Sequence, residues 1–283
     1  HTAAERWRDL DDLLARAVPH VDAVAERAQL RFRRGELHSQ RLSDPDGACE
    51  LLEEALSEQP AHKGARRALE ALMGHAGLRQ RIARTLEPLF ENDGQWDKLA
   101  GVLRVQREAL PEERSPEASA LLGRIARINE EKLNQPLLAL AAYREALRLD
   151  PADVQNRDNV ERIATSLRRF EDLAAAWEEA FRAADEDNLA LRGELLRRAA
   201  ELYDNQIQDA ARARDAWKRL LELDPTSLDT ARPATVALAR LYEQAGQWRE
   251  LIDVLRKQSD WTHGPVRKEL LFRIGEIEQN LLH

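Results

Sequence analysis

The chain has few of the residues that usually mark a redox, metal-bound or membrane-embedded protein. Its 283 residues include one cysteine, Cys49, and one methionine, and aromatic residues make up only 5%. A single cysteine excludes an internal disulfide and fits a reducing compartment. The longest aliphatic run, Leu137–Ala142, is far shorter than the roughly 18 residues that a membrane span requires. We expect no membrane span. The cytoplasm fits these features, and a periplasmic location stays open because no native N-terminus is visible.

Sequence motifs for phosphate, nucleotide or zinc binding are also missing. There is no glycine-rich phosphate loop and no pair of histidines at zinc-ligand spacing. His62 and His75 lie at opposite ends of one expected helix, so they cannot face one ion. Cys49 follows a small residue on a packing helix, where a buried, unreactive thiol is the usual state. We therefore predict no catalytic residue, no metal site and no cofactor.

The composition predicts an all-α protein of the bacterial type. Alanine, leucine, arginine and glutamate dominate, and these residues favour helices. The 37 arginines against six lysines suit a GC-rich bacterial genome. The net charge is −8, whereas nucleic-acid-binding proteins usually carry a basic surplus. The charge balance therefore makes a nucleic-acid partner the less favoured one.

One pattern, L-L-x-R-I-A-x-I/L-x-E-x-x-L, occurs in four variants along the chain. The copies are Leu30–Leu42, Leu121–Leu133, Leu195–Ile207 and Leu270–Leu282, with small central residues at Gly35, Ala126, Ala200 and Gly275. The steps between these small residues are about 91, 74 and 75, which indicates a repeat array. The apolar residues within each copy recur at i, i+3, i+4 and i+7, the spacing of one helix face.

A second helix follows each of the first three copies. Its small residue stands 13 positions after the first, at Ala48, Ala139 and Ala213, and small residues let two helices approach closely. Pro60, Pro151 and Pro225 close these second helices, because the residue before a proline leaves helical geometry.

These residues resemble the tetratricopeptide repeat, in which two antiparallel helices pair within about 34 residues. Ala213, Trp217 and Pro225 match the second helix of that family. The first helix is matched best by the sequence from Leu238 to Gly246, and Trp248 then begins the next helix. The resemblance implies a right-handed superhelical solenoid of about fifteen antiparallel helices. The period near 75 then corresponds to two helical pairs.

We expect a single array over residues 1–283 that is a fragment of a longer one. The expected parts are a partial repeat 1–20, pairs 22–60, 78–110, 116–151, 153–185, 190–225 and 231–260, an extra helix 61–75 and an unpaired helix 264–282. Two departures from the repeat stand out. The spacing of 13 between small residues exceeds the 12 of the family. Arg31 and Arg34 stand where apolar residues are expected, which puts the packing of the first unit in question.

The resemblance also implies a function, which is binding of a protein or peptide partner on a concave surface and organisation of a multiprotein complex. Carried over to this sequence, the groove positions of the family are Arg84, Arg127, Glu130, Arg197, Glu201, Arg240 and Glu243. Trp261 is a further candidate because it lies outside the register of the other tryptophans. Those five, at positions 7, 96, 177, 217 and 248, are expected to pack in the core.

Two alternative functions remain open at this point. A contiguous stripe of arginines would favour binding to RNA or another nucleic acid, whereas alternating charges would disfavour it. The chain could also be a regulatory segment of a larger enzyme. The unpaired C-terminal helix leaves Leu271, Ile274 and Ile277 without the next repeat. Since exposed apolar patches tend to become covered, we expect this helix either to pack back on the array or to associate with another copy of the chain.

Overall fold

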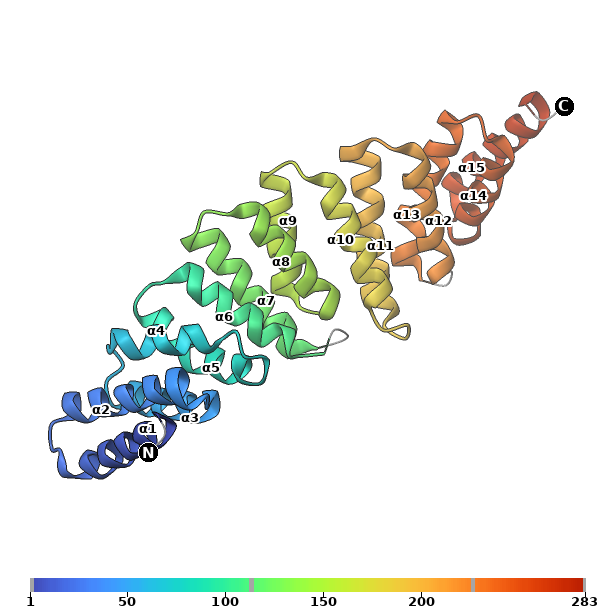
Figure 1. Ribbon diagram of the computed structural model, residues 1–283. Helices are drawn as coiled ribbons and strands as arrows, with labels where there is room; N and C mark the ends of the chain where they lie inside the picture. Colours follow the sequence, from blue (N-terminus) through green and yellow to red (C-terminus); the bar gives the residue numbers. More distant parts are fainter. Residues whose placement is uncertain (1–2, 112–114, 225–226, 282–283) are drawn as a thin grey trace. The chain divides into compact units, whose positions relative to one another are not determined.

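The computed structural model describes residues 3–111, 115–224 and 227–281, with side chains described from residue 6 onward. Within these ranges the chain forms fifteen α helices and no strand, and consecutive helices are joined by short turns (Figure 1). The predicted all-α fold of about fifteen helices is confirmed. Pro225 and Leu282, used in the sequence argument, lie outside the described residues.

Contacts between residues divide the chain into two compact units. The first comprises His1–Pro111 with Arg124–Gln135, and the second comprises Glu112–Gly123 with Pro136–His283. Whether both belong to one continuous array stays a prediction.

The first unit contains a helix that precedes the first pair, then two helical pairs and one intervening helix. Its elements are α1 (Ala3–Ala17), η1 (Val18–His20), α2 (Val24–Leu37), η2 (His38–Leu42), α3 (Pro45–Glu58), α4 (Lys63–Leu72), α5 (Ala76–Asn92), α6 (Trp96–Glu108), the end of α7 (Pro116–Arg127) and η3 (Ile128–Lys132).

The second unit contains the start of α7 and the remaining helices. These are α8 (Pro136–Leu149), α9 (Val154–Ser166), α10 (Phe170–Ala183), α11 (Leu189–Leu202), η4 (Tyr203–Ile207), α12 (Ala210–Leu223), α13 (Leu228–Gln244), α14 (Trp248–Trp261) and α15 (Gly264–Leu281). Below, α2, α5, α7, α9, α11, α13 and α15 are called first helices, and α3, α6, α8, α10, α12 and α14 second helices.

The four alanines expected at helix crossings lie in the core, as predicted. Ala126, Ala139, Ala200 and Ala213 are fully buried. At Gly35 an added Cβ would lie only 2.8 Å from Leu52 Cγ of α3. A carbon atom at that distance is well inside normal van der Waals contact, so the absence of a side chain at position 35 lets α2 and α3 approach this closely.

The extra residue between the small positions forms a π-helical turn. The three turns η2, η3 and η4 end the first helices α2, α7 and α11, and a π turn accommodates one more residue than an α turn. Each is followed by a residue with positive φ, namely Ser43, Asn134 and Gln208. The same backbone hydrogen bond closes all three turns, for example from Asp209 N to Tyr203 O at 2.9 Å.

The other first helices end in a tighter turn. Gly94, Arg168 and Gly246 have positive φ after α5, α9 and α13, and the next amide closes the turn, as from Gln95 N to Phe90 O at 2.9 Å. This is the left-handed termination that ends many helices. The two turn types therefore alternate through each unit, and one π turn plus one tight turn makes the period near 75.

The two arginines that replace apolar residues in the first copy are ion-paired. Arg31 Nε lies 2.9 Å from Glu54 of α3, and Arg34 Nε lies 2.8 Å from Asp11 of α1. Both arginine side chains are mostly buried, at 19% exposure. The packing of this copy is thus preserved by charge pairs in place of apolar contacts.

The C-terminal helix α15 packs back on the preceding helix, which is one of the two outcomes expected for it. Ile274 and Ile277 are buried, because α15 packs against α14, whereas Leu271 and Phe272 of α15 are exposed at 50% and 68%.

Candidate partner-binding surface

In the first unit, the groove positions predicted from the sequence are Arg84, Arg127 and Glu130. Arg84 lies on α5 and Arg127 at the end of α7, and both side chains are exposed. Neither has a carboxylate partner among the residues that the structure describes. Glu130, in η3, is half-buried and makes contacts of its own. The first unit therefore presents two uncommitted arginine side chains at these positions.

In the second unit, the predicted groove residues pair with other charged residues of the chain. Arg197 and Glu201 form an ion pair along α11, and Arg240 of α13 pairs with Asp204 of η4. Glu243 forms an ion pair with Arg273, in which Glu243 Oε1 lies 2.7 Å from Arg273 Nη2. Positive and negative groups thus alternate along these helices.

The remaining candidate residue, Trp261, lies on a helix. It is the last residue of α14, and its side chain is half-buried.

In the second, third and fourth copies of the repeated pattern, the arginine at the fourth position links successive first helices, which the sequence argument did not recognise. Arg124 of α7 pairs with Glu87 and Glu91 of α5. Arg198 of α11 pairs with Glu161 of α9. Arg273 of α15 pairs with Glu243 of α13. The signal was present, because this position is arginine in all four copies.

A second set of charge pairs links successive second helices. Arg144 of α8 donates two hydrogen bonds to Glu179 of α10, at 2.6 and 3.0 Å. These bonds lower the pKa of Glu179, since they favour the ionised carboxylate. Arg219 of α12 forms the same two-pronged contact with Glu178 of α10, at 2.9 and 3.1 Å. Arginine suits these sites because its planar fork binds both carboxylate oxygens.

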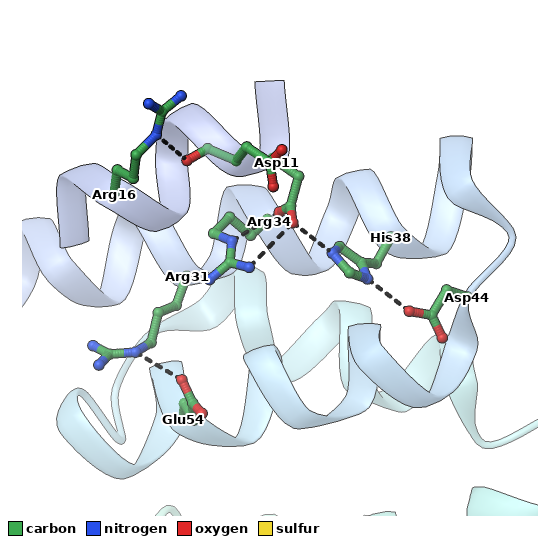
Figure 2. Close-up of polar contacts among 8 residues, drawn as sticks. Asp11, Arg16, Arg31, Arg34, His38, Asp44 and Glu54 are labelled. Carbon is green, nitrogen blue, oxygen red and sulfur yellow. Dashed lines mark hydrogen bonds and ion pairs between the residues drawn. The ribbon is translucent and has the colours of Figure 1, made fainter. Parts of the chain in front are cut away.

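A compact group of charges anchors α1 to the first pair. Figure 2 shows Asp11 of α1 facing Arg34 and His38 of the α2–η2 segment, and His38 in turn facing Asp44. His38 Nδ1 lies 2.8 Å from Asp44 and Nε2 lies 3.2 Å from Asp11. Burial alone would raise the pKa of Asp11, but hydrogen bonds from Arg34 and His38 lower it. Asp44 also caps α3 by accepting from Gly47 N at 3.0 Å.

The tryptophans expected in the core fall into two groups. Trp177 and Trp217 are buried, at 1% and 4% exposure, so the expectation is confirmed for them. Trp7, on α1, and Trp96 and Trp248, at the starts of α6 and α14, are half-buried.

Cys49 is fully buried in α3. Burial, with a smaller contribution from Glu53, raises the pKa of the thiol to about 11. The thiol therefore stays protonated and unreactive at neutral pH.

Metal-ligating side chains and helix hydropathy bear on the kind of site. No group of three or more potential metal-ligating side chains was found in the described part of the chain. None of its helices combines the length and apolarity needed to cross a bilayer.

The alternating turns and stacked helical pairs define a helical repeat protein. Two segments match family models of the tetratricopeptide repeat, residues 194–227 and residues 234–265. The chain is a tetratricopeptide-like helical repeat protein, as predicted. Repeats of this kind generally serve as protein-interaction scaffolds, and the fold is typically non-catalytic. The sequence finds no match among curated proteins.

Several solved structures are similar to this chain at low sequence identity and low TM-score. The C-terminal part of a TPR repeat-containing protein from Cytophaga hutchinsonii is 15% identical over 80% of this chain and 93% of that chain, with a TM-score of 0.30. PilW, a type IV pilus biogenesis factor, is 14% identical over 86% of this chain and 98% of that chain, with a TM-score of 0.34. Human IFIT1, solved as a dimer with m7Gppp-AAAA, is 12% identical over 97% of this chain and 68% of that chain, with a TM-score of 0.36. At these scores none of the three indicates a particular partner.

Proposed function

We propose that the chain is a non-catalytic scaffold that binds a protein or peptide partner through the exposed side of its first helices. The surface in question is the one that is concave in tetratricopeptide repeat proteins. Its proposed contact residues are Arg84, Arg127, Glu130, Arg197, Glu201, Arg240, Glu243 and Trp261.

The observation that supports this proposal most directly is the pattern of charge on the first helices. Arg84 and Arg127 are exposed and have no carboxylate partner within the described residues. An exposed arginine can bind a carboxylate of a partner in two places without first giving up a bond of its own. In the second unit, Arg240 alternates with Asp204 and Glu243. An alternating surface suits a partner that carries both signs of charge, and a nucleic acid carries only one.

A peptide-display selection on the purified chain would test the proposal. The enriched peptides should bind the native chain and lose about tenfold or more in affinity for the Arg84→Glu/Arg127→Glu variant, because charge-assisted hydrogen bonds are lost. The Arg197→Glu/Arg240→Glu variant tests the second unit in the same way.

Arg104→Glu serves as the matched control. Arg104 is an exposed arginine of α6 outside the proposed surface. Each variant is first checked for native helicity by circular dichroism. Peptides that bind all variants equally well, or saturable binding of random-sequence RNA at physiological salt, would show that the proposal is wrong.

A further inference from the structure

A pocket lies in the second unit, where the start of α10 meets the end of η4. It encloses about 490 Å³. The apolar residues that line it are Phe170 and Ile207, and both side chains are half-buried. Arg168 and Gln206 also line it, and both are exposed. We call this site the Arg168 pocket.

Helices of the second unit lie on both sides of the Arg168 pocket. The preceding second helix, α8, packs against α10, and the following one, α12, packs against both α11 and η4. The pocket is therefore open although the helices that precede and follow its elements are in place.

Arg168 stands in a tight turn at the position where the two equivalent turns have glycine. The positive φ of 54° at Arg168 corresponds to 65° at Gly94 and 66° at Gly246. In each of the three turns, an aromatic residue begins the next helix two positions later. A side chain in the left-handed conformation costs stability that glycine does not lose. The chain thus carries a long cationic side chain where glycine would make the turn more stable.

The carboxylates that line the Arg168 pocket already have partners. Arg212 donates two hydrogen bonds to Glu171, both at 2.8 Å, and these bonds lower the pKa of the Glu171 carboxyl. Asp172 pairs with Arg169 within the first turn of α10. Among the described residues, no carboxylate pairs with Arg168. The pocket therefore offers one uncommitted cation beside an apolar surface.

We propose that the Arg168 pocket binds a short acidic segment of a partner protein, in which a carboxylate side chain stands next to a large apolar residue. The planar guanidinium of Arg168 binds both oxygens of the carboxylate. The adjacent apolar side chain packs against Phe170 and Ile207. Glu171 and Asp172 disfavour a nucleic acid, because they repel its successive phosphates. The pocket contains none of the contact residues proposed above for the first helices, so either proposal can fail alone.

Nuclear magnetic resonance spectra of the intact chain would test this binding, with the Ile207 methyl and the Gln206 side-chain amide as reporters. The probe is a capped hexapeptide of glycine and serine with a central leucine–glutamate pair. Both reporter signals should shift saturably, with a dissociation constant of about 1 mM, since one charged contact and one apolar side chain contribute. Peptides with lysine in place of glutamate, or serine in place of leucine, should bind about tenfold more weakly.

Arg168→Gly separates a binding role from a structural one. The variant gives this turn the residue of the two equivalent turns, so the thermal midpoint of unfolding should be equal or higher. Peptide binding should nevertheless weaken about tenfold, because the charge-assisted hydrogen bonds are lost. Arg249→Ala is the matched control. It removes an exposed arginine of α14 outside the pocket and should leave peptide binding as in the native chain.

Four results would overturn the proposal. The leucine–glutamate peptide could produce no saturable shift of the Ile207 signal. It could bind the Arg168→Gly variant as tightly as the native chain. The lysine peptide could bind as well as the glutamate peptide. Single-stranded RNA of random sequence could bind at Ile207 more tightly than the peptide at physiological salt, which would assign the pocket to a nucleic acid.

Discussion

Replacing glycine by alanine at two equivalent positions should change stability in opposite directions. Gly35 and Gly275 hold the same place in the first and fourth copies of the repeated pattern, on α2 and α15. A Cβ at position 35 would lie 2.8 Å from Leu52 Cγ and 2.9 Å from Leu52 Cδ2. A Cβ at position 275 meets nothing within 4 Å.

The magnitudes follow from two opposing effects. Alanine stabilises a helix interior by about 1 kcal/mol relative to glycine. Overpacking of a close helix crossing costs about 1–3 kcal/mol. Gly35→Ala should therefore destabilise the first unit by about 1 kcal/mol net. Gly275→Ala should stabilise α15 by about 0.5–1 kcal/mol, because only the helix preference changes.

Urea unfolding followed by circular dichroism would measure both effects. Because the two units could unfold separately, hydrogen exchange of peptides from α2–α3 and from α15 should accompany the unfolding curves. If the urea midpoints of both variants shift in the same direction, or if Gly35→Ala is the more stable of the two, then the close crossing of α2 and α3 does not exclude a side chain at position 35.

Further predictions concern the core, the ion pairs and the thiol. Ala200→Leu should lower the free energy of unfolding by about 1–3 kcal/mol, because Ala200 is fully buried where α11 packs against α12, and an unchanged urea midpoint would contradict that packing. The pKa of Glu179 is held below its ordinary value of 4.5. The Arg144–Glu179 pair should therefore stabilise the protein above pH 4.5, and this stabilisation should be lost as the pH falls below 4.5 and through the lowered pKa. Glu179→Gln should therefore flatten the pH dependence of unfolding below pH 4.5, whereas an unchanged slope would rule the pair out as a cause. With the pKa of its thiol raised to about 11, Cys49 should react with a disulfide reagent at neutral pH only after denaturant is added.

The sequence predicted the helices well, because the apolar and small residues that determine them repeat locally. The all-α fold class follows from composition and periodicity, and the burial of Ala126, Ala139, Ala200 and Ala213 follows from the repeated spacing of small residues. The spacing of 13 between small residues showed that one residue was extra. Periodicity could not say that a π turn takes it up, since the hydrogen bonds that close the turn depend on backbone geometry.

The charged residues were harder to interpret from sequence. From the sequence, Arg31 and Arg34 were expected to disturb the packing of the first copy. Their ion-pair partners, Glu54 and Asp11, lie on other helices, and no sequence pattern predicts those pairings. Similarly, Arg240 read as a free groove residue, and its pairing with Asp204 depends on how η4 ends α11. Partner-binding positions inferred from sequence therefore include side chains that already pair within the chain.

The alternation of turns bears on how such a chain can lengthen or shorten. A tight turn and a π turn close their helices with different backbone hydrogen bonds, so a helical pair differs from its neighbour in the turn that joins its two helices. A cassette of 74 or 75 residues, such as the stretch from Ala126 to Ala200, begins and ends at the same turn type. Duplicating or deleting this cassette would preserve the alternation of tight and π turns, whereas removing one helical pair would place two turns of the same type next to each other. The minimal module for building variants of this protein is therefore four helices long.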